Sequence, residues 1–142
     1  MALSAPRYLA DKSALARLRL PAVAARLQPL LDERAVATCS VVDLGLLYSA
    51  RNATEHHQRR TNLTRTFALA PIDQAVLERA VEVQGLLAEV GAHRGASVGD
   101  VIIAAAAEAA GLTVLHYDAD YDLIASVTGQ PTEWVVARGE VS

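Results

Sequence analysis

Four aspartates lie where apolar segments end or a helix begins, and carboxylates in such places can serve as metal ligands. Asp11 ends one apolar segment, Asp118 and Asp120 follow another, and Asp100 lies in the first turn of an alanine-rich helix. In an open parallel sheet the functional crevice lies at the carboxyl ends of the strands, so these four side chains would converge on one edge. Carboxylate oxygens suit Mg²⁺ or Mn²⁺, and such an ion activates water and stabilises charge on a phosphodiester.

Each of these acids also has an ordinary structural interpretation. Ser97 and Asp100 have the spacing of a capping box, in which a serine and an acid three residues later bond to each other's backbone N–H groups. Asp11 could be a helix N-cap, and Asp118 or Asp120 could be a turn residue. Taken singly, each acid is more often structural than catalytic, and only their combination favours a metal site.

The elements that must position these acids alternate between strands and helices. Apolar runs predict short strands at residues 7–11, 35–39, 113–116 and 133–136. Helical spacing predicts helices at residues 13–19, 21–33, 40–52, 51–65, 74–90, 101–110 and 121–127, with a connection over residues 67–73. Ser40 is expected to be an N-cap, with Asp43 three residues after it. This alternation is typical of a single α/β domain, residues 1–142, whose parallel central sheet is flanked by helices.

The composition limits the environment in which such a site can work. The chain has 142 residues and a net charge of -3, so it lacks the global positive charge of a typical nucleic-acid coat protein. Cys39 is the only cysteine, which excludes an intrachain disulfide and a cysteine-rich metal site. The apolar run Val101–Ala107 is too short to span a bilayer, and the N-terminal residues lack the pattern of a signal peptide. We therefore expect a cytoplasmic protein with no membrane contact.

The basic side chains that could contact a phosphate are almost all arginines. Of the 13 Lys and Arg residues only Lys12 is a lysine, and the most basic region is residues 51–65. A guanidinium group matches the geometry of a phosphate better than an ammonium group does. Arg59 and Arg60 in that region, and Arg94 in a loop, are candidate phosphate contacts, although an exposed arginine more often is simply solvated. The histidines do not form a metal-spaced cluster and stay unassigned.

Five stretches of the chain together resemble one known family. They are Tyr8–Ala14, Thr38–Arg51, Val98–Ala105, His116–Ala125 and Gln130–Val136, and they extend over nearly the whole chain in the expected order. On these stretches the chain is similar to PIN-domain ribonucleases. More specifically, it resembles VapC-type toxins of type II toxin–antitoxin pairs, of the actinobacterial kind.

This resemblance implies a metal-dependent endonuclease that cuts RNA with Mg²⁺ or Mn²⁺. It implies that Asp11, Asp100 and Asp118 are the catalytic metal ligands, and that Asp120 shares or replaces the role of Asp118. Ser13 would hydrogen-bond Asp11 or a water on the metal, unless it is an ordinary helix-start residue. The implied partners are RNA and a VapB-type antitoxin whose C-terminal segment covers the acidic site. The toxin would be a homodimer or part of a toxin–antitoxin hetero-oligomer.

The chain departs from the family pattern at Gly45. Family members normally carry a second acid directly before the Leu-Leu-Tyr-Ser-Ala stretch, and here that position is glycine. Asp43 could stand in for it, but side chains two residues apart point about 200° apart on a helix. The other interpretations are a weakened nuclease and an inactivating substitution, because an active toxin kills the cell that makes it. The alternative to an active enzyme is a nuclease-dead PIN module that binds antitoxin or RNA.

A phosphoacceptor receiver domain is a third hypothesis, because it too is an α/β domain with acids at strand ends. Lys12 directly after Asp11, and the lack of a separate lysine at a later strand end, disfavour it. An acetyl-phosphate labelling experiment that gives no adduct would exclude it.

Overall fold

The protein is built around one five-stranded sheet, seen here in a computed structural model that describes residues 5–142; residues 1–4 of the expected domain lie outside it. The strands are β1 (Tyr8–Ala10), β2 (Val36–Thr38), β3 (Ala68–Leu69), β4 (Thr113–His116) and β5 (Thr132–Trp134). Their spatial order is β3-β2-β1-β4-β5, and every neighbouring pair is parallel. The predicted α/β fold with a parallel sheet is confirmed. The strand order differs from the 2-1-3-4-5 order of receiver-like folds.

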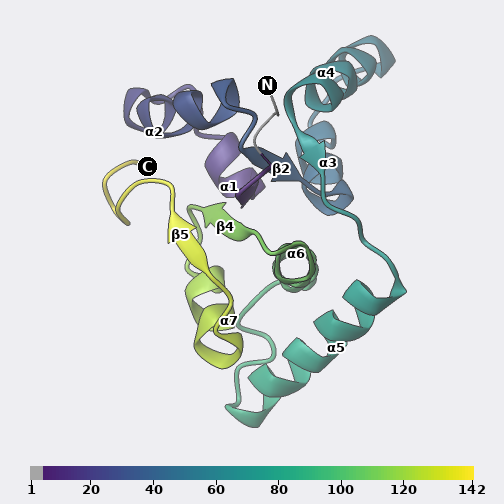
Figure 1. Ribbon diagram of the computed structural model, residues 1–142, viewed down its shortest axis with the longest axis vertical. Coiled ribbons are helices and arrows are strands. Elements are labelled where there is room, and N and C mark those ends of the chain that lie inside the picture. The colour runs from purple at the N-terminus through teal and green to yellow at the C-terminus, as the bar shows by residue number, and fades with distance from the viewer. Residues whose placement is uncertain (1–4) are drawn as a thin grey trace.

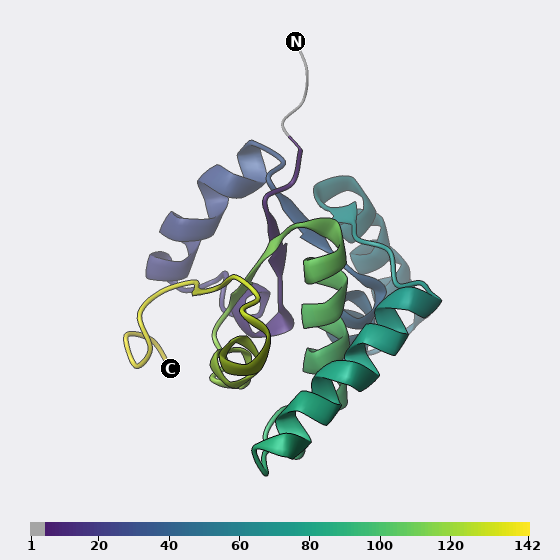
Figure 2. The same ribbon diagram turned by 60° about the horizontal axis from the view of Figure 1, so that its bottom comes forward.

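Helices connect the strands and cover both faces of the sheet (Figure 1). They are α1 (Lys12–Leu15), α2 (Pro21–Asp32), α3 (Ser40–Leu47), α4 (Ala53–Thr66), α5 (Gln74–Glu89), α6 (Val98–Ala110) and α7 (Asp120–Thr128). Helices α1 and α2 belong to one apolar cluster, and α3, α5, α6 and α7 belong to the cluster on the other face. Figure 2 shows α5 running alongside α6. Within residues 5–142, no helix has both the length and the apolar character that a membrane span needs.

The central strands are short and apolar on both sides, as expected for a parallel sheet with both faces covered. Leu9 pairs with Val114 and faces the α6 cluster, while Ala10 pairs with Leu115 and faces the α2 cluster. All four side chains are fully buried. Because this register aligns the ends of β1 and β4, the backbone N–H of Asp11 donates to the Leu115 carbonyl at 2.9 Å. The first acid is thereby fixed directly at the carboxyl end of the sheet.

Helix α6 is buried over most of its length and carries Asp100 to that same edge. Its buried residues include Val101, Ile103 and the run Ala104–Ala107. Small alanine side chains let α5 and the sheet approach closely, because the distance between packed helices depends on the side chains at the contact. Gly111 ends the helix with a φ of 69°, the left-handed conformation that favours glycine. The predicted alanine-rich helix is confirmed, although it begins at Val98 rather than at Val101.

Several local predictions were wrong. The helices predicted at residues 13–19 and 40–52 end earlier, at Leu15 and Leu47. Ala68–Leu69, expected to be a connection, is the edge strand β3, and its two exposed side chains give no alternating apolar signal. Ser40 is not an N-cap: α3 begins at Ser40, and Cys39 precedes it without a side-chain capping bond, because β2 ends only two residues before the helix. Asp120 begins α7 and is not a turn residue. These differences leave the order and direction of the main elements unchanged.

Candidate metal centre

The four aspartates singled out in the sequence line one cleft of about 430 Å³. Asp11 follows β1 and Asp118 follows β4, so the parallel pairing of these strands brings both acids to one edge of the sheet. Asp100 comes from the first turn of α6, and Asp120 is the first residue of α7. The structure therefore brings together carboxylates from three separate parts of the chain.

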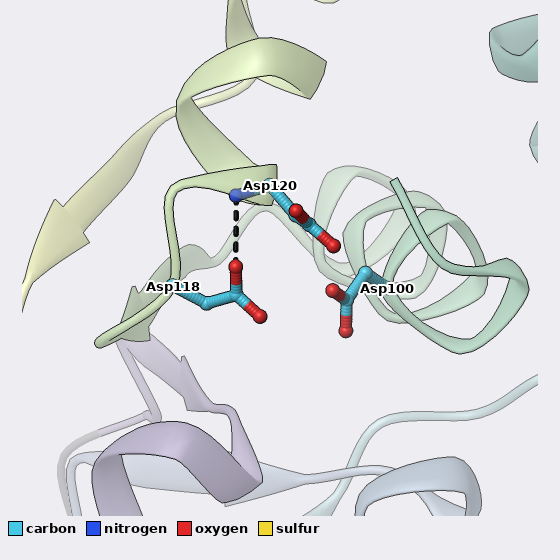
Figure 3. A group of neighbouring side chains, drawn as sticks. All are labelled: Asp100, Asp118 and Asp120. Atoms are coloured by element: carbon cyan, nitrogen blue, oxygen red, sulfur yellow. Dashed lines mark hydrogen bonds between the residues drawn. The ribbon is translucent and has the colours of Figure 1, made fainter. Parts of the chain in front are cut away.

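Asp100, Asp118 and Asp120 form the closest group within the cleft. One carboxylate oxygen of each lies within 4.8 Å of the corresponding oxygens of the other two. Figure 3 shows the carboxylate groups gathered in one place, and the Asp120 N–H donates to Asp118 Oδ1 at 2.9 Å. A set of carboxylate oxygens without nitrogen or sulfur is what Mg²⁺ and Mn²⁺ prefer. The residues present therefore fit an ion of this class.

Asp11 is buried, with only 5% of its surface exposed, and hydrogen bonds to Oδ2 hold its side chain. The Ser13 N–H donates to this oxygen at 3.0 Å and the Ser13 hydroxyl at 2.6 Å. The Ser13 oxygen in turn accepts the Tyr117 N–H at 2.9 Å. Asp11 is thus the N-cap of α1 and also a wall of the cleft, so the two interpretations of this residue are compatible.

Tyr121 contacts two of the acids and was not among the predicted site residues. Its side chain is fully buried, and its Oη lies 2.9 Å from Asp11 Oδ1 and 3.1 Å from Asp100 Oδ1. The sequence predicted only a short helix at residues 121–127 and gave Tyr121 no role. The available signal was chemical, because a buried tyrosine hydroxyl usually has a hydrogen-bond partner.

The capping box expected at Ser97 and Asp100 is only half formed. The Ser97 hydroxyl accepts the Asp100 N–H at 3.1 Å, as a helix N-cap does. The reciprocal bond goes elsewhere, because the Ser97 N–H donates to Asp120 Oδ2 at 3.3 Å. The Asp100 carboxylate is therefore not used for capping and faces the cleft.

His116 packs against two aromatic rings and is not among the residues that line the cleft. Its ring lies 4.9 Å from the Tyr121 ring and 5.0 Å from the Trp134 ring, measured between centroids. Nδ1 accepts the Asp118 N–H at 3.1 Å. Burial lowers the pKa of His116, which favours the neutral ring that this acceptor role requires. His116 thus positions the loop that carries Asp118.

Negative charge is concentrated in the cleft, where Asp11 is buried and the other three acids are partly buried, so solvent screens their repulsion less than on an open surface. Burial raises the pKa of Asp100 from 3.8 to about 7, assisted by the neighbouring Asp120 carboxyl group and by the charges of Asp11 and Asp118. The pKa of Asp100 is higher in the folded chain than in the unfolded chain. The folded state therefore loses stability as the pH rises from 3.8, the ordinary pKa, to about 7, the pKa in the folded chain. Above that range the folded chain carries repelling carboxylates that a cation would offset.

We expect Mn²⁺ to raise the thermal unfolding midpoint at pH 8, because the cation would offset the repulsion among the ionised carboxylates. At 100 times its dissociation constant a ligand adds about 2.7 kcal/mol to the free energy of unfolding, or roughly 10 °C for a chain of this size. Asp100→Asn should raise the midpoint in EDTA and lose most of the Mn²⁺-dependent rise. Scanning fluorimetry measures both, with Asp32→Asn, an exposed position at the end of α2, as the control. Equal Mn²⁺-dependent rises in all three proteins would contradict the prediction.

Gly45 lies in the same cleft, at the position where the family pattern has an acid. Its φ is not positive, so the backbone of α3 does not require glycine here. A Cβ at Gly45 would lie 3.3 Å from Lys12 Cδ, which belongs to a flexible and exposed side chain. A larger residue would therefore fit if Lys12 moved slightly.

Asp43 does not reach this cleft, which is a correction to the interpretation that it stands in for the missing acid. It lines a neighbouring pocket of about 370 Å³ together with His56 and Arg60. Its Oδ1 is buried and has no hydrogen-bond partner among residues 5–142. The physical reason is the helical geometry of α3, which turns positions 43 and 45 toward different sides.

The arginines predicted to contact phosphate do not line the cleft. Arg59 donates to the Leu46 carbonyl at 3.2 Å and to the Ser49 hydroxyl at 2.9 Å, so it joins α4 to the end of α3. Arg60 lines the neighbouring pocket, and Arg94 is exposed in the loop before α6. Contact of these three side chains with RNA stays a prediction.

Two other cations, Lys12 and Arg17, do line the cleft and were not predicted. The Arg17 guanidinium donates to the Ser13 carbonyl at 2.7 Å and lies 4.7 Å from the centre of the Tyr117 ring. The spacing of four residues between Ser13 and Arg17 could have indicated this, because such residues lie on one side of a helical segment. The lining of the cleft thus contains two basic side chains as well as the four acids.

A family model and individual sequence relatives assign the chain to the same family. The chain matches the family described as PIN domain over residues 8–127. It is 44% identical to Ribonuclease VapC21 of Mycobacterium tuberculosis, over 94% of this chain and 96% of that protein. It is 45% identical to Ribonuclease VapC51 of the same species, over 95% and 97% of the two chains.

Solved structures share the fold at low sequence identity. VapBC2 from Rickettsia felis bound to a DNA fragment from its promoter superposes with a TM-score of 0.72 and 14% identity, over 89% of this chain and 96% of that chain. DNA-bound VapBC from Salmonella typhimurium gives a TM-score of 0.71 and 14% identity, over 92% and 99%. The matched family extends over most of the chain, and the sequence relatives extend over nearly all of it. The chain therefore belongs to the PIN-domain family and, within it, to the VapC ribonucleases.

Proposed function

We propose that this chain is the toxin of a type II toxin–antitoxin pair and cleaves RNA as an endoribonuclease that depends on Mg²⁺ or Mn²⁺. The observation that carries the proposal is the convergence of Asp11, Asp100, Asp118 and Asp120 in one cleft of a PIN fold. The activity named for the relatives at 44% and 45% identity supports it. Membership of this family also favours an intracellular nucleic acid over other phosphodiester substrates.

Asp100, Asp118 and Asp120 would hold the ion, with Asp11 beside them. When bound, a divalent ion offsets charge on the phosphodiester and makes water a better nucleophile. The protein contributes the fixed placement of the acids, because Ser13 holds Asp11 Oδ2. These acids repel RNA until the cation is present, so activity should depend steeply on the metal concentration.

Lys12 and Arg17 would bind the RNA backbone where it enters the cleft. Charge-assisted hydrogen bonds to phosphate are about twice as strong as neutral ones, and Arg can make them with two N–H groups. These contacts carry no sequence information, because they reach the phosphate and not the base edges. They would hold the scissile strand near the carboxylates.

Cleavage of RNA by the purified chain tests this function. We expect cuts in the presence of Mn²⁺ or Mg²⁺, none in EDTA, and discrete new 5′ ends that sequencing can locate. A nuclease-dead PIN module that binds antitoxin or RNA is the second candidate, favoured by the absence of an acid at Gly45. Binding of Mn²⁺ without any cleavage would support that candidate, and absence of both would contradict the metal centre.

The proposed protein partner is a VapB-type antitoxin. The VapBC complexes among the structural neighbours support this class of partner. Two pockets between α3 and α4, of about 370 and 420 Å³, share Leu44, Leu47 and His56. Leu44 and Tyr48 are 68% and 90% exposed there, and exposed apolar side chains gathered in one place favour a protein contact. A homodimer of the toxin and a cytoplasmic location stay predictions.

Tyr48→Asp should weaken association with a VapB-type antitoxin by at least about tenfold, because it places a charge in an apolar contact. Isothermal titration calorimetry of each purified toxin variant with the separately purified antitoxin measures the change in affinity. Val81→Asp is the matched control, because Val81 is 70% exposed on α5 and lies outside both pockets. Equal weakening by the two variants would show that the α3–α4 surface is not the docking site.

A further inference from the structure

The hydroxyl of Tyr121 joins two carboxylates that reach the cleft from different elements. Asp11 precedes α1 and Asp100 lies in α6, and the Tyr121 Oη is 2.9 Å from the first and 3.1 Å from the second. Tyr121 is fully buried, and its ring packs against His116 with a centroid separation of 4.9 Å. The hydroxyl therefore has a fixed place behind the acids.

The hydrogen bonds of the two acids are unequal. Asp11 Oδ2 is held by two donors from Ser13, whatever Tyr121 does. Within residues 5–142, the Tyr121 hydroxyl is the only O–H or N–H group that donates to the Asp100 carboxylate. Removing this hydroxyl would free the Asp100 side chain while Asp11 stayed in place.

A phenol at this position can interact with either acid without adding a charge. Its single O–H proton is donated to one carboxylate at a time, and both Asp11 Oδ1 and Asp100 Oδ1 lie within donor distance. A tyrosine hydroxyl is neutral near pH 7, so it does not itself attract or repel a cation.

We propose that Tyr121 is a positioning residue for the metal centre, and that its hydroxyl fixes the Asp100 carboxylate relative to Asp11. This inference rests on the proposed metal-dependent function. With Asp100 Oδ1 held by the phenol, the Asp100 carboxylate keeps a fixed orientation in the group that it forms with Asp118 and Asp120. The ion then meets an arranged set of oxygens and does not have to order them as it binds, which improves affinity.

The test is the affinity of Tyr121→Phe for Mn²⁺ alone, measured from the electron paramagnetic resonance signal of the free ion. We expect at least about tenfold weaker binding, the loss typical when a group that orients a metal ligand is removed. Tyr8→Phe is the matched control, because it removes a hydroxyl that contacts Arg26 on a different part of the sheet. This control should bind Mn²⁺ within about twofold of the unmodified chain.

A second measurement separates positioning from a general loss of structure. The concentration of Mn²⁺ that gives half-maximal RNA cleavage should rise in Tyr121→Phe, while the rate at saturating Mn²⁺ changes much less. Circular dichroism and the thermal unfolding midpoint in EDTA check that Tyr121→Phe is folded. If the variant is not folded, the same titration on Tyr121→Met decides, because that side chain is flexible enough to fill an irregular space in the core and carries no hydrogen-bond donor.

The outcomes distinguish this inference from the proposed function. If Tyr121→Phe binds Mn²⁺ like the unmodified chain while Asp100→Asn does not, the positioning role is wrong and the metal centre stands. If Tyr8→Phe loses as much affinity as Tyr121→Phe, the effect is not specific to the cleft and the inference is overturned. If the unmodified chain does not bind Mn²⁺ at all, the proposed metal-dependent function fails and the inference fails with it.

Discussion

Asp118→Asn should lower RNA cleavage by at least about 100-fold, because the substitution removes one carboxylate charge from the group that would hold the ion. The fold should survive, since an asparagine oxygen can still accept the Asp120 N–H that Asp118 Oδ1 accepts now. A gel assay of RNA cleavage over a range of Mn²⁺ concentrations measures the loss. High Mn²⁺ should restore only part of the activity, because the charge deficit remains.

Two further variants show whether the loss of cleavage in Asp118→Asn is specific to that acid. Asp32→Asn, far from the cleft, should cleave like the unmodified chain. Asp120→Asn compares the two acids after β4: one of its oxygens is already occupied by the Ser97 N–H, so we expect a smaller loss than for Asp118→Asn. If Asp118→Asn and Asp120→Asn both retained full activity, singly and together, these acids would not be metal ligands.

Gly45→Glu should raise cleavage about 10- to 100-fold at limiting Mn²⁺, because it adds a carboxylate to a cleft that already holds four. The backbone allows the change, since Gly45 has ordinary helical geometry, and any residue other than glycine or proline also favours the helix. The obstacle is Lys12, whose Cδ lies 3.3 Å from the new Cβ. A flexible and exposed lysine can move aside.

Gly45→Gln is the matched control for this gain. It has nearly the same shape as Glu, displaces Lys12 in the same way and carries no charge. If charge is what the cleft lacks, Gln should leave activity near that of the unmodified chain and only Glu should increase it. Equal activities of the Glu and Gln variants, with robust cleavage by the unmodified chain, would show that no further acid is needed.

The convergence of the acids could be predicted from the sequence because it follows from topology. Asp11 and Asp118 directly follow apolar runs, and parallel strands place their carboxyl ends together whatever their partners are. Asp100 could be predicted to join this group of acids, because it lies in the first turn of the helix α6 that begins at the same edge of the sheet. The ambiguity at Ser97 could not be resolved in advance, because spacing alone does not say which acid accepts its N–H. The structure assigns that bond to Asp120.

The missed features depend on side-chain geometry. Tyr121 has the periodicity of a core residue, and its ring is in the core; only its last atom belongs to the cleft. Arg17 was not among the predicted residues, because its place in the cleft depends on the bond of its guanidinium to the Ser13 carbonyl, which no pattern of residue types shows. The edge strand β3 has only two residues, too few for any period to be recognised.

The central place of β1 has a consequence for how the protein is made on the ribosome. Its neighbour β4 begins only at Thr113, and the Tyr121 contact with Asp11 joins residues 110 positions apart. Contacts between such distant residues form late, because a large loop must close first. A nascent chain therefore carries Asp11 for most of its synthesis with no partner acids in place. The proposed metal centre is complete only after Asp118 and Asp120 have been made, so a chain that ends before them lacks the group of acids.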